Sequence, residues 1–201
     1  MSRPTFAGDL SRLPDHAFGH RSLTWWGVMG FITVEAAGFA LAAGAYFYLA
    51  NQVPRWPPDH PPPDLLWSGL FTALLLLSEV PNVWLKKAAE GMDLRRTRLG
   101  LVAVVLAGAV LLGIRALEFT TLNVRWDENA YGSILWALLL LHTVHLLTDW
   151  VDTGVLAALM FTRHVNPRRF VDTSENALYW HFVVLTWLPV YAILYWAPRW
   201  M

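Results

Sequence analysis

Five long apolar stretches run through this chain, and a polar or proline-rich segment separates each from the next. A helix that crosses about 30 Å of hydrocarbon needs about 20 apolar residues, and all five stretches meet that requirement. Backbone groups in lipid must be hydrogen-bonded internally, and the chain lacks the alternating segments of about ten residues that a barrel needs. The pattern therefore predicts an all-α integral membrane bundle of five transmembrane helices. Their expected bounds are Leu23 to Leu49, Leu65 to Leu85, Leu99 to Leu117, Tyr131 to Phe161 and Leu178 to Trp196.

The segments outside these stretches suggest a simple domain organisation. Residues 1–22 form a polar N-terminal tail without the apolar core and cleavage site of a secretory signal, so the first stretch is expected to remain as an anchor. Residues 23–197 are expected to form a single transmembrane domain. Six prolines fall within residues 54–63, which predicts an extended, polyproline-like loop on the outer side. This loop is either a stiff spacer or a docking surface for a neighbouring subunit.

Composition narrows the classes of function. Hydrophobic residues make up 56% of the chain and charged residues only 15%, too few to cover a water-facing surface on every side. The formal net charge is zero, so nothing suggests binding to nucleic acid or to another polyanion. Cysteine is absent, which excludes disulfides, thiolate metal sites and a cysteine nucleophile.

Basic residues gather on one side of the predicted membrane. Eleven of the fifteen lie in the tail and after the second and fourth stretches, three lie on the other side, and Arg115 lies within a span. Because cytoplasmic segments carry the excess of Lys and Arg, we expect a cytoplasmic N-terminus and a periplasmic C-terminus. The eleven are Arg3, Arg12, Arg21, Lys86, Lys87, Arg95, Arg96, Arg98, Arg163, Arg168 and Arg169.

Seven ionisable residues fall at membrane depth, where such residues usually face a protein interior or a cavity. They are Glu35, Glu79, His142, His145, Asp149, Asp152 and His181. Glu35 lies about 12 residues into the first stretch, which is about 18 Å along a helix and near mid-membrane. A structural hydrogen bond from its carboxyl to a neighbouring helix is the favoured interpretation, and a proton-conducting role is the alternative.

The fourth stretch carries a polar stripe formed by His142, His145, Asp149 and Asp152. Their spacing of three, four and three residues places them on one face of a helix. Such a face should point at other helices or at another subunit rather than at lipid. A packed interface is favoured, with a proton relay and a lipid head-group site as the alternatives.

Two further pairs suggest specific chemistry. His145 and His181 fall at similar depth on different helices and could clamp a haem, although packing roles are commoner for lone histidines. Arg115 and Glu118 lie three residues apart at the outer end of the third stretch, which predicts a local ion pair. Both side chains could extend toward the lipid head groups, which is sufficient to explain a charged pair at this position. No HExxH or comparable ligand spacing occurs in the sequence, so a metal-hydrolase site is not expected.

Several short motifs, taken in their order along the chain, resemble subunit III of the cytochrome c oxidases, which belong to the haem–copper oxidases. They are FITVEAAGF at 31–39, EG at 90–91 before a basic cluster, YGS at 131–133, H-x-x-H at 142–145 and YWHF at 179–182. Glu118, which closes the third stretch, also falls in place. The chain is similar to the short, five-helix bacterial form of this family rather than to its seven-helix members. It departs from the family pattern at Val34, Glu79, Thr143 and Val184.

The resemblance implies a non-catalytic subunit in a bacterial inner membrane. Subunit III carries no haem or copper, packs beside the haem- and copper-bearing subunits I and II, holds phospholipid and helps to sustain proton uptake by the oxygen-reducing core. We therefore expect neither catalytic residues nor a metal site. Three carboxyls have an expected proton or lipid role, namely those of Glu35, Glu79 and Glu118. The last-helix motif comprises Tyr179, Trp180 and His181.

Two alternatives from other classes remain open at this point. The chain could be the accessory subunit of a quinol oxidase or of a nitric oxide reductase, because the electron donor binds elsewhere in such complexes. It could also be a proton or solute transporter in which Glu35, Glu79 and the polar stripe form the pathway.

Overall fold

The computed structural model describes residues 16–58, 60–162 and 165–200. Five long helices dominate these ranges: α1 (Leu23–Ala50), α2 (Leu66–Glu90), α3 (Leu94–Thr120), α4 (Ala130–Phe161) and α5 (Pro167–Tyr191). A 3-10 turn (Gly19–Arg21) precedes α1, and α5 continues through a π-helical turn (Ala192–Trp196) into a 3-10 turn (Ala197–Arg199). All five helices are long and apolar enough to cross a membrane, and the described ranges contain no strand. The predicted bundle of five transmembrane helices is confirmed.

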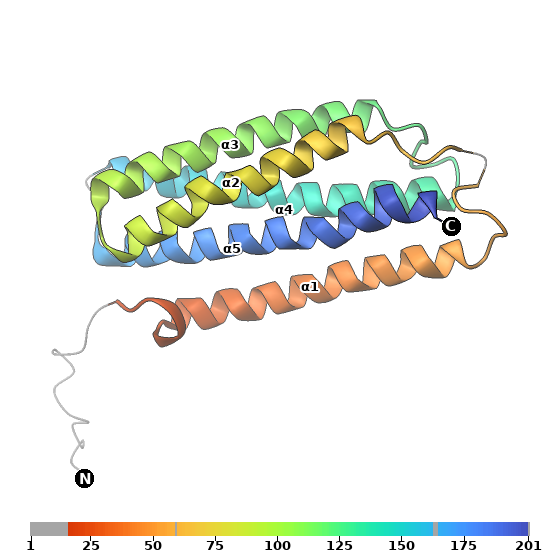
Figure 1. Ribbon diagram of the computed structural model, residues 1–201. Helices are drawn as coiled ribbons and strands as arrows, with labels where there is room; N and C mark the ends of the chain where they lie inside the picture. Colours follow the sequence, from red (N-terminus) through yellow and green to blue (C-terminus); the bar gives the residue numbers. More distant parts are fainter. Residues whose placement is uncertain (1–15, 59, 163–164, 201) are drawn as a thin grey trace, which may run out of the picture.

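Consecutive helices run in opposite directions along the bundle (Figure 1). The helices α2 to α5 pack together, whereas α1 lies at the edge and packs against α4 and α5 (Figure 1). The start of α1 and the end of α5 lie at opposite ends of the bundle, as an odd number of spans requires. Which end faces the cytoplasm stays a prediction. Residues 1–15 of the predicted tail, with Arg3 and Arg12, lie outside the described residues, as does Arg163.

The helices extend beyond the apolar stretches that predict them. The helices α3 and α5 begin at Leu94 and Pro167, both earlier than expected, so most of the basic segment after α2 is helical rather than a loop. Apolar length marks only the part of a helix that lies in lipid, because helical hydrogen bonds are internal and continue into the polar region. Both starts are capped: the side chains of Asp93 and Asn166 accept backbone N–H groups three residues later, at 3.0 and 3.1 Å.

The proline-rich loop is not the extended segment that its composition predicts. The backbone turns and bends through residues 51–58 and at His60, and the indole of Trp56 is buried at the end of the bundle where α1 ends. Its ring packs edge-on against Tyr46 and Tyr131, with centroids 5.4 and 5.1 Å away. Nε2 of His60 lies 2.7 Å from a carboxylate oxygen of Glu128 in the α3–α4 loop. Burial of a large aromatic ring therefore overrides the local preference of proline for an extended backbone.

Close helix packing depends on small residues at two positions. A Cβ atom at Gly108 of α3 would collide with Cδ1 of Trp150 on α4. The indole N–H of Trp150 donates to the carbonyl oxygen of Val105 at 2.8 Å, so the ring lies directly across α3. At Gly132 a Cβ would collide with the carbonyl oxygen of Arg125. These glycines let α3, α4 and the loop between them approach closely.

Candidate functional site

Glu35 of α1 lies at a junction of three helices. The hydroxyl of Tyr179 on α5 donates to Oε2 at 2.5 Å, and Nε2 of His145 on α4 lies 3.3 Å from Oε1. Nδ1 of His145 lies 2.6 Å from the carbonyl oxygen of Leu141, which can only accept, so this nitrogen carries a ring proton. The contact between Nε2 of His145 and the carboxyl of Glu35 is attractive when one of these two groups carries a further proton, because it can then donate a hydrogen bond to the other. The predicted hydrogen bond from Glu35 to neighbouring helices is confirmed.

A cleft of about 810 Å³ runs along this junction, between α1, α4 and α5. Apolar atoms, among them those of Phe31 and Val144, make up most of its exposed wall, although more than half of the lining residues are polar or charged. The polar groups of Glu35, His145 and Tyr179 also face it. The cleft thus gives a carboxyl near mid-membrane access to an elongated, largely apolar space.

The same cleft reaches an acidic cluster near the start of α5. Nδ2 of Asn176 donates to Oδ1 of Asp149 at 2.9 Å and lies 3.4 Å from Oδ2 of Asp152. The hydroxyl of Thr153 donates to Oδ1 of Asn176 at 2.9 Å, which fixes the amide. The other oxygen of Asp149 is buried and has no hydrogen-bond partner among the described residues. This half of the polar stripe therefore points at α5, as expected for a packed interface.

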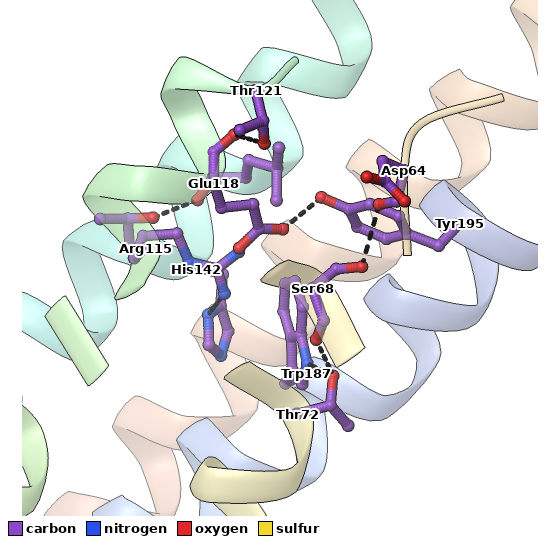
Figure 2. A network of polar contacts seen from close by, with 11 residues as sticks. Asp64, Ser68, Thr72, Arg115, Glu118, Thr121, His142, Trp187 and Tyr195 are labelled. Carbon is purple, nitrogen blue, oxygen red and sulfur yellow. Dashed lines mark hydrogen bonds and ion pairs between the residues drawn. The ribbon is translucent and has the colours of Figure 1, made fainter. Parts of the chain in front are cut away.

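A second cluster lies between α3, α4 and α5 (Figure 2). Nη1 of Arg115 donates to Oε2 of Glu118 at 2.7 Å, and the hydroxyl of Tyr195 donates to Oε1. Nε2 of His142 lies 3.0 Å from the carbonyl oxygen of Val183, so that nitrogen donates. Nδ1 is then free to accept from Nη2 of Arg115, 3.4 Å away. A neutral imidazole suffices in this cluster, in which Nε of Arg115 is buried without a hydrogen-bond partner among the described residues.

The predicted ion pair between Arg115 and Glu118 is confirmed, but the expectation that it snorkels toward the head groups is wrong. The two side chains are only 1% and 2% exposed. The guanidinium carbon lies 3.7 Å from the ring centroid of Phe71 and 4.1 Å from that of Trp187. Aromatic faces attract a cation most strongly where water is excluded, so the arginine turns into the bundle.

A third cluster joins α2 to α5. A carboxylate oxygen of Glu79 forms an ion-pair contact with Nδ1 of His181. Nδ2 of Asn82 donates to the carbonyl oxygen of Ala177 at 2.9 Å and lies 3.5 Å from the same ring nitrogen. His181 and His145 therefore contact carboxylates on different helices, and both nitrogens of His145 are engaged, so the geometry does not support a haem clamp. Within the described ranges, no group of three or more side chains is arranged to hold a metal ion.

The last-helix motif contacts two neighbouring helices. Tyr179 contacts Glu35 on α1, His181 contacts Glu79 on α2, and the indole N–H of Trp180 donates to the hydroxyl oxygen of Ser78 on α2 at 3.0 Å. Three consecutive polar contacts thus hold α5 between α1 and α2. Their part in proton uptake or lipid binding stays a prediction.

Five apolar spans, with ionisable side chains paired inside them, define a multi-pass integral membrane protein. The family model described as "Cytochrome c oxidase subunit III" matches residues 14–199. The chain therefore belongs to the cytochrome c oxidase subunit III family. That membership makes it part of a multisubunit haem–copper oxidase of the respiratory chain, and it does not favour a quinol oxidase, a nitric oxide reductase or a transporter.

Relatives named cytochrome c oxidase subunit 3 match over most of their length. The protein of Thermostichus vulcanus is 25% identical, and the match covers 90% of each chain. That of Synechocystis sp. is 26% identical over 88% of this chain and 77% of the relative. That of Lumbricus terrestris is 27% identical over 85% of this chain and 69% of the relative. The shorter coverage of the last agrees with the extra length of some family members.

Sequence reasoning missed two contributors to these clusters. Asn176 lies in a segment predicted as a polar connection, and no pattern links it to the acids of α4. Tyr195 was expected only within the fifth span, yet it completes the shell of Glu118. Both lie on α5 or its continuation, whose rotation about its axis is decided by packing.

Proposed function

We propose that this chain is the cofactor-free, non-catalytic subunit III of a bacterial cytochrome c oxidase. It packs beside haem- and copper-bearing subunits I and II in the inner membrane, with its N-terminus in the cytoplasm. This chain stabilises the catalytic subunit and sustains the proton uptake of that subunit. It also binds phospholipid. Family membership and the arrangement of the internal polar groups support this proposal.

The Glu35 junction carries the proposal. Its carboxyl is held by a tyrosine and an imidazole from two other helices, at 16% side-chain exposure, and it borders the cleft. Ionisable side chains that face one another inside a membrane commonly mark a proton pathway. The junction also fastens α1, the peripheral helix, to the bundle.

The cleft supports the proposal of a bound phospholipid. The exposed atoms of its wall are mainly apolar, which suits acyl chains, and its far end combines carboxyl groups with Arg169, which suits a head group that carries an amine beside its phosphate. A lipid there would fill space between α1 and the other helices. Removing it would loosen the contact that Glu35 makes with α4 and α5.

Purification through a tag on this chain tests the proposal. Subunits with haem and copper should co-purify, with phospholipid detected by mass spectrometry of the extracted complex. Glu35→Gln keeps the shape and removes the charge, so we expect normal haem spectra but slower proton uptake and earlier loss of activity during turnover. Tyr179→Phe leaves the carboxyl in place and should have a smaller effect. A tagged chain that emerges from its native membrane without haem- and copper-bearing subunits would refute the assignment.

A further inference from the structure

The pair formed by Glu79 and His181 lies at mid-membrane depth on the outside of the bundle. Glu79 is 13 residues from the start of the 25-residue helix α2, which corresponds to about 20 Å along its axis. The side chains of Glu79 and His181 are 23% and 28% exposed, in contrast to the buried pair of Arg115 and Glu118. Polar groups at this depth normally face protein or a water-filled cavity.

His181 is oriented so that its second ring nitrogen faces outward. Nδ1 is occupied by the carboxylate of Glu79 and lies near the amide of Asn82, which in turn is held by the backbone of α5. A carboxylate on one ring nitrogen orients an imidazole so that the other nitrogen is presented to a partner. Nε2 makes no hydrogen bond with the part of the chain that the structure describes, and it is not among the buried unpartnered atoms.

The surface around this nitrogen is apolar. On α2, Leu76 and Val83 are 46% and 38% exposed and lie three or four residues from Glu79. On α5, Leu185 lies four residues after His181 and is 64% exposed. Side chains at these spacings share one helix face. The result is an apolar patch with one polar centre, here called the Glu79–His181 face and comprising Leu76, Glu79, Val83, His181 and Leu185.

The chemistry of this face selects protein over lipid as its cover. At mid-membrane a phospholipid presents only hydrocarbon, which cannot satisfy an accessible ring nitrogen. A neighbouring transmembrane helix can supply both an apolar surface and a hydrogen-bonding side chain. We propose that the Glu79–His181 face docks a transmembrane helix of another subunit of the oxidase, and that this helix bonds Nε2 of His181 through a polar side chain. This inference rests on the proposed function, because it requires the complex.

Site-directed crosslinking tests the docking. The chain contains no cysteine, so single cysteines can be introduced without background. Leu185→Cys places a photoreactive maleimide on the face, whereas Leu106→Cys places it on α3 at a matched exposure of 62%. In the purified oxidase complex, the probe at residue 185 should crosslink another transmembrane subunit, and a fluorescent maleimide at the same position should be shielded from a lipid-borne quencher. Equal quenching at both positions, without a protein crosslink at residue 185, would overturn the proposal.

Removing the polar centre provides a second test. The double variant Glu79→Leu/His181→Leu leaves no unpaired charge, so its amount in the membrane should be normal. Its retention by tagged subunit I during detergent washing should fall roughly threefold to tenfold, the loss expected for one interhelical hydrogen bond. His181→Gln keeps a hydrogen-bonding group and should restore part of the retention. Wild-type retention of the double variant would refute the docking contact.

The two levels of proposal fail in distinguishable ways. If haem- and copper-bearing subunits never accompany the wild-type chain, the proposed function is wrong. If they accompany it and the probe at Leu185 meets only lipid, the function stands and the docking face is wrong.

Discussion

Removing Glu118 should destabilise the bundle far more than its single hydrogen bond to a tyrosine suggests. In Glu118→Leu, the guanidinium of Arg115 remains 1% exposed with no carboxylate beside it. Breaking a buried ion pair from one side costs about 3–5 kcal/mol. The rings of Phe71 and Trp187 contact the guanidinium in the wild type as well, so their cation–π contribution of about 2 kcal/mol does not offset this loss. We expect the free energy of unfolding to fall by roughly 3–5 kcal/mol.

The partner substitution should be milder, because the two groups differ in their chemistry. A guanidinium stays charged, whereas a carboxyl left alone can take up a proton and still accept the hydrogen bond of Tyr195. Arg115→Leu should therefore lower stability by less than Glu118→Leu. The double variant Arg115→Leu/Glu118→Leu removes both charges, and apolar replacement of a buried pair is often neutral. We expect it to lie within about 1 kcal/mol of the wild type.

The assay is unfolding of the purified chain in mixed micelles by titration with SDS, with helicity followed by circular dichroism. The coupling energy follows from the wild type, the two single variants and the double variant. Losses that add in the double variant would show that Arg115 and Glu118 act independently. An Arg115→Leu variant less stable than Glu118→Leu would refute the argument from neutralisation.

Three other changes have expected outcomes in the same preparation. Tyr179→Phe removes the hydrogen bond to Glu35, so the free energy of unfolding should fall by about 1–3 kcal/mol; a change below 0.5 kcal/mol would contradict it. Gly108→Ala should lower it by about 1–3 kcal/mol, because the new Cβ meets an indole, whereas Gly113→Ala on the same helix meets nothing within 4 Å and should be neutral. Hydrogen bonds from a backbone N–H and an imidazole lower the pKa of Glu128 below 4.5. The contact between its carboxylate and His60 of the α1–α2 loop is therefore stabilising above pH 4.5 and is lost as the pH falls through the lowered pKa. A spin label in that loop should become more mobile on acidification, and Glu128→Gln should abolish the change.

Much of the fold could be predicted from local properties. The number and order of spans followed from apolar length, which any bilayer-crossing helix must satisfy. The face formed by His142, His145 and Asp149 followed from helical spacing alone. The bounds of α3 and α5 did not follow, because a helix needs caps and internal hydrogen bonds rather than apolar residues to continue beyond the lipid.

By itself, the sequence determined an all-helical membrane bundle with paired ionisable groups and the motifs of its family. Only the tertiary structure decided which groups pair, because Glu35 and Tyr179 are 144 residues apart and their contact depends on how α5 is rotated and packed. It alone showed that Arg115 turns inward onto aromatic faces while His181 turns a nitrogen outward. The physical reason is that apolar length and spacing are properties of one segment, whereas burial and hydrogen-bond partners arise from several segments together.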